Sequence, residues 1–307
     1  MPTPGTSDYD VQLSQETERI FGILGEMDFA NVRVVLEELL DNEDIDNEYN
    51  AAMIAAENEF INRHDKLHAV KVVHNALRVY GMLKDIIELQ GMTVASSAPA
   101  FQASRFIAQS GRVLDVPLAR ECSCGVVAVS SYLHDVCKYM KRHDEAAGYY
   151  IHEKLPEWLQ PLEDPEVAQV KEYLATCLLP LIVTCIQKHT GVDEASNAEE
   201  GIVMLADSLD NDKERIRDIY PPEVVLSKDE KPIEYFSCAA VKKISLDSVG
   251  AGSDRRLSIT FGITDNSGWY QVHQFKKAME KSRLGRFVEL SVSILWENRI
   301  VKITVQK

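Results

Sequence analysis

The hydrophobic period of this chain changes near residue 220, and this change constrains the fold more than any single motif. Before it, apolar residues recur at intervals of three and four, as on one face of an α-helix; one example is Val32, Val35, Leu36 and Leu39. Beyond it they alternate with polar residues, which is typical of half-buried β-strands; one example is Leu257, Ile259, Phe261 and Ile263. The sequence therefore predicts an all-α domain at residues 11–219, followed by a small α+β domain at residues 236–307.

The expected elements of each part can be placed by residue range. Helical spacing covers 11–40 and predicts further helices at 49–61, 67–90, 119–140, 144–154, 165–188 and 199–214, with loop and a short helix over 91–117. In the second part we expect a helix at 270–281 and strands at 237–244, 257–263, 288–296 and 301–305, in the order β-β-α-β-β. Residues 1–10 are expected to form a disordered tail, and the proline-punctuated residues 220–235 a linker.

The net charge of −15 over 307 residues bears on the partners of the chain. An acidic surface repels phosphate polymers and anionic lipid, so we expect no nucleic-acid polymer and no membrane as a partner. A small phosphorylated substrate needs only a local cationic pocket. The longest largely apolar run, Leu178–Ile186, is too short to span a bilayer. The six cysteines form no Cys-x-x-Cys pair and no secretory segment opens the chain, which favours a cytoplasmic protein.

The histidines are the side chains most suited to chemistry, because imidazole is both a metal ligand and a near-neutral acid–base group. Seven of the eight precede residue 220. The ordered set, each member on or beside an apolar helix, is His64 and His68, then His134-Asp135, then His143 and His189, then Asp207. A His-Asp pair taken alone is more often a surface pair than a ligand set, so the prediction depends on the order. Several helices would have to converge to bring these side chains together.

The ordered set is similar to the H…HD…D pattern of the HD superfamily of metal-dependent phosphohydrolases. His68 lies in His-Ala-Val-Lys-Val-Val-His-Asn-Ala-Leu, His134-Asp135 in Tyr-Leu-His-Asp-Val-Cys-Lys, and Asp207 in Met-Leu-Ala-Asp-Ser-Leu-Asp. The match covers about residues 60–217. The resemblance implies an all-α HD domain that binds metal through His68, His134, Asp135 and Asp207. His64 and His74 are nearby alternatives to His68, because a shift of one helical turn is easy.

A closer resemblance is to an archaeal-type branch of uncharacterised predicted HD hydrolases. That branch carries N-D-H-G-x-x-H, where this chain has Asn62-Arg63-His64-Asp65-Lys66-Leu67-His68, and a later G-R-x-R, where it has Glu214-Arg215-Ile216-Arg217. Arg63, Asp65 and Glu214 depart from the pattern and leave the ligands intact. The same branch is similar in carrying a β-rich C-terminal domain like residues 236–307, which brings no known activity with it.

The chemistry that the resemblance implies is hydrolysis of a phosphate ester, with a small phosphorylated metabolite or a nucleotide as substrate. Two imidazoles and two carboxylates suit one or two divalent ions, of which Mn, Fe, Ni, Zn and Mg are the candidates. Asp135 could also orient or deprotonate the nucleophile, and His143 and His189 could bind phosphate, protonate the leaving group or hold a second metal. The expected phosphate-binding side chains are Lys138, Arg142, Lys188, Arg215 and Arg217. His152 and His273 are expected to be structural.

Two other interpretations stay open from the sequence. One is a catalytically silent HD-fold protein with a regulatory or scaffolding role, and the other is a di-iron enzyme of the oxygenase type. The C-terminal part shows no ligand cluster and no glycine-rich phosphate loop. We interpret it as a dimerisation or regulatory ligand-binding module, so that a homo-oligomer could form through it, since unpaired strand edges favour association between chains.

Overall fold

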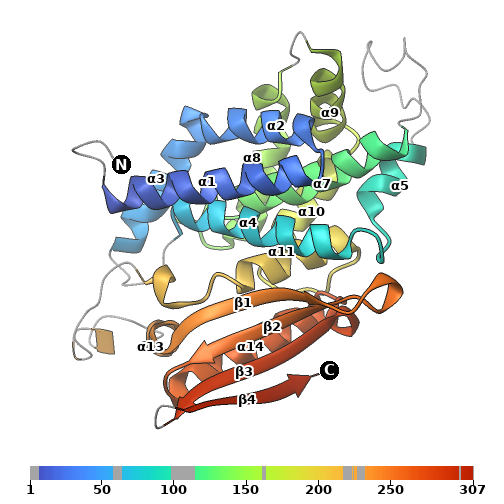
Figure 1. Cartoon of the computed structure of the whole chain (residues 1–307). Coiled ribbons are helices and arrows are strands. Elements are labelled where there is room, and N and C mark those ends of the chain that lie inside the picture. The colour runs from blue at the N-terminus through green and yellow to red at the C-terminus, as the bar shows by residue number, and fades with distance from the viewer. Residues whose placement is uncertain are drawn as a thin grey trace.

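The computed structural model describes residues 7–57, 64–97, 115–160, 164–216, 223, 225–226, 232–296 and 299–306. Its helices form the upper part of the molecule in Figure 1, and a four-stranded sheet with two helices forms the lower part. The expected helical part followed by a small α+β part is therefore confirmed. Within the described residues, no single helix is long and apolar enough to cross a membrane. Helices α9 (Pro165–Ala175) and α10 (Leu179–Lys188), bent by 56° at their junction, together pass a test of length and composition alone.

The first part is built from ten described α-helices and one short 3-10 helix. They are α1 (Asp8–Glu26), α2 (Ala30–Leu40), α3 (Glu43–Glu57), α4 (Lys66–Leu83), α5 (Gln90–Ser97), α7 (Val116–Leu133), α8 (His143–Trp158), α9 (Pro165–Ala175), α10 (Leu179–Lys188), α11 (Ala198–Ser208) and η1 (Lys213–Arg215). Helix α1 begins at Asp8 because Ser7 and Asp10 form a capping box. The predicted disordered tail is therefore wrong for residues 8–10, and residues 1–6 lie outside the described part.

Several predicted helices are divided or shorter in the structure. The helical run 11–40 breaks at Asp28, which adopts a left-handed conformation (φ 60°) between α1 and α2. The predicted helix 165–188 is two helices, because Pro180 at the start of α10 cannot continue the helix before it. Helices α4, α7 and α11 end at Leu83, Leu133 and Ser208, earlier than the apolar spacing suggested.

Helices α4 and α7 form the centre of the helical part. Every residue of α7 from Cys122 to Leu133 is buried, and α2, α4, α5, α9, α10 and α11 all pack against it. Buried carboxylates fix two of these neighbours. Glu121 on α7 accepts hydrogen bonds from the backbone N–H groups of Asn31 and Val32 at the start of α2 (2.7 and 3.2 Å). Glu199 on α11 does the same for Gln90 and Gly91 at the start of α5 (3.0 and 2.7 Å).

The second part has the predicted order of strands and helix, preceded by one further helix. Its elements are α13 (Pro232–Ala240), β1 (Val241–Val249), η2 (Gly252–Asp254), β2 (Arg256–Ile263), η3 (Asn266–Gly268), α14 (Trp269–Lys281), η4 (Gly285–Phe287), β3 (Val288–Trp296) and β4 (Arg299–Gln306). The predicted first strand at 237–244 is wrong in its first half, because α13 continues to Ala240 and β1 starts at Val241. A short apolar run such as this one fits either a helix or a strand by periodicity.

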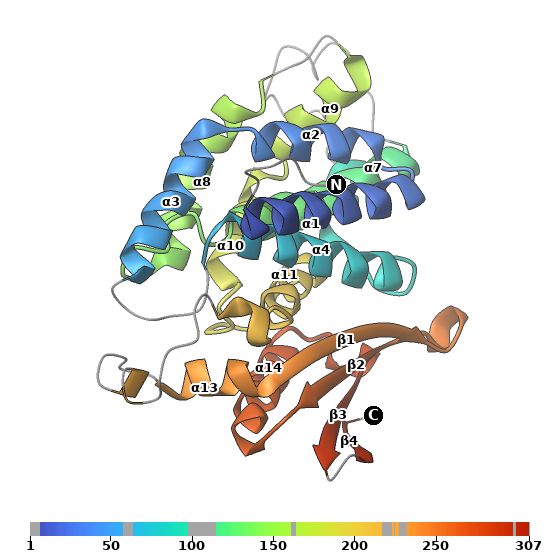
Figure 2. The same cartoon turned by 60° about the vertical axis from the view of Figure 1, so that its left-hand side comes forward.

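The sheet has the order β1-β2-β3-β4, with antiparallel outer pairs and a parallel central pair, β2 and β3. Helix α14 makes the crossover between the parallel strands, as parallel pairing requires. Phe275 of α14 packs on Phe261 of β2 with ring centroids 5.4 Å apart, so α14 covers the apolar face. Strand β1 lies nearest the helical part and β4 farthest from it (Figures 1 and 2).

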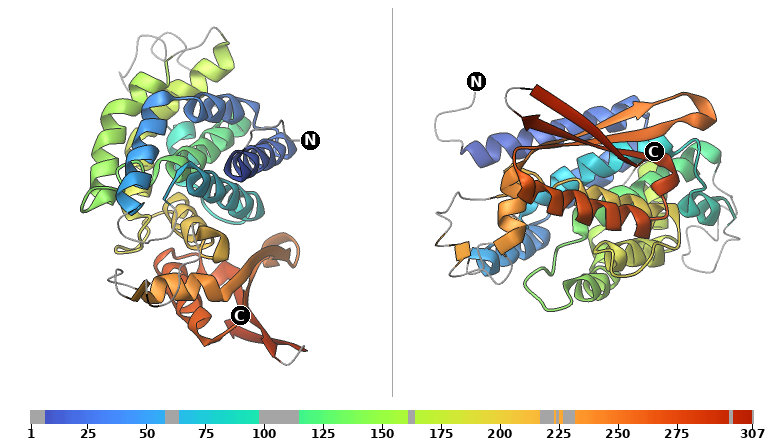
Figure 3. Two further views of the ribbon diagram at one scale, coloured as in Figure 1. Left: turned by 90° about the vertical axis from the view of Figure 1, so that its left-hand side faces the viewer. Right: turned by 90° about the horizontal axis from the view of Figure 1, so that it is seen from below.

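The two parts are joined through α11 and α14, which lie against each other (Figure 3). The backbone N–H of Ala195 donates to the carbonyl of Lys281 at the end of α14 (2.9 Å), and Arg283 pairs with Glu194 (3.2 Å). Gly201 of α11 lies so close to the turn after α14 that a Cβ at this position would meet the carbonyl oxygen of Ser282 at 2.4 Å. The absence of a side chain at Gly201 is thus a condition for this packing.

Candidate metal centre

The ends of five helices converge on one buried cluster of histidine and aspartate side chains. His68 lies in the first turn of α4, where Asp65 caps the helix by accepting from the His68 N–H (3.1 Å). His134 and Asp135 directly follow α7, and Asp207 lies in the last turn of α11. His189 directly follows α10, and His143 is the first residue of α8. His68, His134, Asp135 and His189 are 2 % exposed or less, so the centre of the cluster is shielded from solvent.

Three of these side chains, His68, His134 and Asp207, surround a common point. The Nε2 atoms of His68 and His134 are 3.2 Å apart, and each faces Oδ1 of Asp207, at 3.3 Å from His68 and 3.7 Å from His134. Oδ2 of Asp135 lies 3.7 Å from the first nitrogen and 3.5 Å from the second. Ligands about 2.0–2.2 Å from one ion are separated by roughly 3.0–3.5 Å, so the spacings among His68, His134 and Asp207 are close to those around a single metal ion, whereas Asp135 falls in neighbouring groups.

The outer nitrogens of three histidines explain why their Nε2 atoms point inward. Nδ1 of His68 lies 2.6 Å from Oδ2 of Asp210, Nδ1 of His134 lies 2.8 Å from the carbonyl of Ser131, and Nδ1 of His189 lies 2.6 Å from the carbonyl of Ile186. Oxygen acceptors at these distances place the proton on Nδ1, which leaves the Nε2 lone pair free. Histidines that bind metal are held in this way.

Asp207 supplies a further indication that the cluster suits a cation. Its Oδ1 is buried and has no hydrogen-bond donor among the described residues, although buried carboxylate oxygens are normally satisfied. Around it lie two imidazole nitrogens and, at 3.6 Å, the guanidinium of Arg215. A metal ion at the common point would satisfy this oxygen and both nitrogens together.

Asp135 connects this centre to a second group of side chains. Its Oδ2 lies 2.6 Å from Nδ1 of His64, and its Oδ1 faces Lys138 (3.1 Å), His189 (3.4 Å) and His143 (3.5 Å). The Lys138 ammonium also donates to Nε2 of His143 (3.0 Å). Lys138 and His143 are 25 % and 19 % exposed at their side chains and Asp207 is 21 % exposed, so solvent reaches the cluster on this side as well as at Asp207.

The ionisation states of the cluster suit a metal site. Burial lowers the pKa of His134 to about 3, so this imidazole is neutral at pH 7. Burial, and then the charge of Lys138, lower the pKa of His143 to about 4. Burial alone would raise the pKa of Asp135, but Lys138 and the imidazoles of His134 and His64 outweigh it and hold that pKa well below its usual value. The pKa of Asp207 is likewise held well below its usual value, because His68 and Arg215 outweigh the effect of its burial.

These side chains form three overlapping groups that could hold a metal ion. They are His68, His134 and Asp207; His134, Asp135 and His189; and His64, His68 and Asp135. The first group is the one that contains the unsatisfied oxygen of Asp207. Comparisons with protein-family models, with curated proteins and with solved structures found no match to this chain. The interpretation of the site therefore depends on its own geometry, which is compatible with an HD-type arrangement.

The structure separates the predicted site residues into those at the cluster and those elsewhere. His68, His134, Asp135, Asp207, His143, His189 and Lys138 all lie in it. His64 contacts Asp135 at its edge, whereas His74 pairs with Glu16 (2.9 Å). His74 is therefore no longer an alternative to His68 as a ligand, and His64 is the alternative that remains. Of His64 and His68, it is His68 that also faces His134 and Asp207.

The predicted phosphate-binding residues are less uniform. Arg215 is 6 % exposed, and its guanidinium contacts Asp207, the carbonyl of Asp210 and Asn211, so it is committed to the cluster itself. Lys188 binds Glu200 and Ser196, and Arg142 pairs with Glu145. Arg217 lies outside the described residues. Sequence reasoning missed the contact of Asp210 with His68. Asp210 follows Asp207 by three residues at the end of α11, and this spacing was a usable signal.

Metal binding should release a proton from His68. Burial and Arg215 lower the pKa of this imidazole, but Asp207 and Asp210 outweigh them and raise it above 6.5 in the metal-free chain. Below the raised pKa a proton occupies the nitrogen that the metal needs, so affinity should rise with pH, by up to about tenfold per unit, and level off above that pKa. Calorimetric titration with Mn²⁺ at pH 6, in two buffers of different ionisation enthalpy, should show release of about one proton per ion. An affinity that does not change from pH 6 to pH 8 would contradict this.

Proposed function

We propose that this chain is a metal-dependent hydrolase that cleaves a phosphate ester in a small phosphorylated metabolite or a nucleotide. The observation that carries the proposal is the meeting of the His68 and His134 Nε2 atoms with the unsatisfied Oδ1 of Asp207. Two imidazoles with the carboxylates of Asp207 and Asp135 suit Mn, Fe, Ni, Zn or Mg. The HD-type order of these residues along the chain supports phosphoester hydrolysis as the reaction.

A divalent ion bound at this point would lower the pKa of a water molecule and polarise a phosphoryl oxygen. Phosphate binding and proton transfer would depend on the side chains around it. Lys138 is the cation on the accessible side of the cluster, so its ammonium would hold a phosphate oxygen. His143 is neutral at pH 7, and its Nε2 accepts a hydrogen bond from that ammonium (3.0 Å), so it would become free to accept the proton of the attacking water when a substrate phosphate draws Lys138 away. Asp135 and His189, both buried, would orient these groups.

The direct test is metal analysis of the purified chain followed by a phosphatase screen with nucleotides and p-nitrophenyl phosphate. We expect stoichiometric metal and turnover that is lost with a chelator and restored by the ion. Stoichiometric metal without turnover on any phosphoester would favour the silent regulatory or scaffolding interpretation instead. Two irons per chain with oxygen-dependent turnover would favour the oxygenase interpretation.

Replacing Lys138 with glutamine should reduce kcat/KM for the best phosphoester about 100-fold, because one phosphate oxygen would lose its charged partner. Metal content should be unchanged, since an ammonium cannot be a ligand. The measurement is steady-state kinetics together with metal analysis of the same sample. Lys154→Gln is the matched control, because Lys154 lies at the surface of α8 and pairs only with Glu157 among the described residues. Equal losses in the two variants would argue against a role for Lys138 in binding substrate.

Self-association through the C-terminal part stays a prediction. Strand β4 has one partner strand, β3, and three of its apolar side chains, Ile300, Val301 and Ile303, are 40 % exposed or more. A free edge with apolar side chains favours pairing with another chain. Sedimentation of the chain over a range of concentrations measures this directly.

A further inference from the structure

A second cavity lies at the opposite ends of the two central helices from the metal centre. It has a volume of about 680 Å³ and is formed by the turn between α1 and α2, the C-terminal end of α4 and the N-terminal ends of α7 and α9. Helix α7 runs from this cavity to His134 and, with 18 residues, is about 27 Å long. Pockets that bind small molecules typically measure about 300–1,000 Å³. The cavity is therefore large enough for a ligand and separate from the metal centre.

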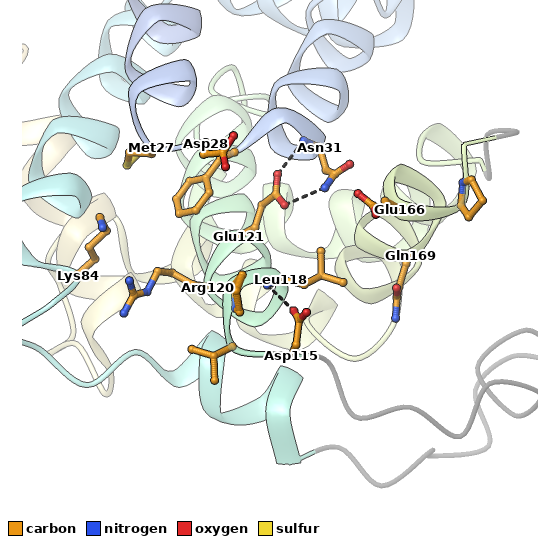
Figure 4. A pocket seen from close by; sticks show the side chains of 14 residues that line it. Met27, Asp28, Asn31, Lys84, Asp115, Leu118, Arg120, Glu121, Glu166 and Gln169 are labelled. Carbon is orange, nitrogen blue, oxygen red and sulfur yellow. Dashed lines mark hydrogen bonds between the residues drawn. The ribbon is translucent and has the colours of Figure 1, made fainter.

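The charged side chains of this cavity are divided between its sides. Figure 4 shows Lys84 and Arg120 together on one side, and Asp115, Glu166 and Gln169 on the other. Phe29 and Leu118 are among the apolar side chains of the lining. An anionic ligand without a cationic group would meet the carboxylates, and a cationic ligand without an anionic group would meet Lys84 and Arg120. A dipolar ligand fits both sides.

Among the described residues, the two cations have a single acidic partner at salt-bridge distance. Lys84 and Arg120 share one carboxylate, that of Asp85, with Nζ of Lys84 at 3.6 Å and NH1 of Arg120 at 3.3 Å from its oxygens. Nε of Arg120 is buried and has no hydrogen-bond partner among the described residues. Two cations therefore share one carboxylate, and an anionic group of a ligand would supply a second partner.

Not every carboxylate of the lining is available to a ligand. Glu121 is engaged with Asn31 and Val32, so its charge is used at the start of α2. Asp115 uses Oδ1 to cap α7 through the N–H of Leu118 (3.0 Å), which leaves its second oxygen for another donor. Glu166 is exposed in the first turn of α9. Asp28, Asp115 and Glu166 are thus the lining carboxylates that a protonated amine could approach, and Asp115 and Glu166 lie on the side opposite Lys84 and Arg120.

From these observations we propose that the cavity binds a small zwitterion. Its carboxylate or phosphate lies against Lys84 and Arg120, its ammonium group against Asp115 and Glu166, and its apolar spacer over Phe29 and Leu118. This proposal does not depend on the function of the metal centre.

The test uses metal-free protein, because amino acids chelate metal ions. The probes are ω-amino acids from glycine to 8-aminooctanoate, with phosphoethanolamine to compare phosphate with carboxylate. Hexanoate and hexylamine each carry one of the two charges. At about 10 mM, at least one zwitterion should raise Tm by about 2 °C. Saturation-transfer NMR should show the two single-charge probes to bind at least about tenfold more weakly. The proposal fails if no zwitterion binds, or if hexanoate or hexylamine binds equally well.

Two substitutions test whether the zwitterion binds in this cavity. Arg120→Gln and Glu166→Gln should each weaken the best zwitterion about tenfold, because each removes the partner of one ligand charge. Glu166 is exposed, so its replacement is not expected to disturb folding even if that of Arg120 does. Lys154→Gln on α8 should leave the affinity unchanged. If Glu166→Gln binds as the unmodified chain does, the ligand lies elsewhere and the proposal is wrong.

Discussion

Replacing Asp207 with asparagine should lower Mn²⁺ affinity by at least about 100-fold and reduce phosphoester hydrolysis by on the order of 1,000-fold. The carboxylate has a buried oxygen without a donor and faces two imidazole nitrogens, so its negative charge is needed where a metal ion would lie. Asparagine has nearly the same shape and a neutral oxygen, which weakens the attraction for a divalent cation. Titration calorimetry and steady-state kinetics measure the two effects.

Two further variants make this result specific. Asp210→Asn keeps the hydrogen-bond acceptor for Nδ1 of His68 but removes its charge, and we expect a smaller loss of metal affinity, about 10-fold. Asp247→Asn, at an exposed position of β1, changes the same charge far from the cluster and should have no effect. If Asp207→Asn retains full metal affinity, Asp207 is not a ligand, and the proposed donor set is wrong.

Replacing Gly201 with alanine should destabilise the chain by about 3 kcal/mol, one of the largest effects available from a single methyl group. The added Cβ would lie 2.4 Å from the carbonyl oxygen of Ser282. That carbonyl cannot easily move, because the Ser282 N–H bonds to Ala278 (2.7 Å) and its hydroxyl bonds to Met279 (2.8 Å). Helix α11 and the end of α14 would have to separate. Urea denaturation monitored by circular dichroism should show this loss.

Gly22→Ala is the control for the replacement itself. Gly22 lies inside α1, and a Cβ there would have no neighbour within 4 Å outside its own helix. Alanine is the better helix former, so this variant should gain roughly 0.5–1 kcal/mol in the free energy of unfolding. An unfolding free energy of Gly201→Ala within about 0.5 kcal/mol of the original chain would show that the contact between α11 and α14 can relax.

The predictability of the fold differed between strands and helices. Strands β2, β3 and β4 were predicted within two residues at each end, because alternation such as Leu257, Ile259 and Phe261 has no helical alternative. Helix ends were missed where a local conformation ends the helix while the apolar spacing continues, as at Asp28. The error at 237–244 has a different cause, since Cys238 and Ala240 are buried on a helix and a short apolar run of this kind would suit a strand equally.

At the candidate site, local motifs indicated which side chains would meet but not their roles. His134-Asp135 and Asp207 follow from short motifs at helix ends. The choice between His64 and His68 needed the register of α4, which Asp65 sets by capping the N–H of His68. Arg215 was expected to bind substrate, and its position inside the cluster depends on packing between distant segments. The second cavity could not be foreseen, because its lining comes from the turn between α1 and α2 and from the ends of α4, α7 and α9, which are separate segments of the chain.

Gly201 and Asp207 lie on the same helix, less than two turns apart. Because a helical segment this short is stiff, the packing of α14 against Gly201 also affects the position of Asp207 relative to His68 and His134. A misplacement of about 1 Å can cost on the order of 100-fold in rate at a reactive centre. The packing of the C-terminal part against α11 therefore helps to fix the position of Asp207. None of the described side chains of the C-terminal part lies in the histidine cluster itself.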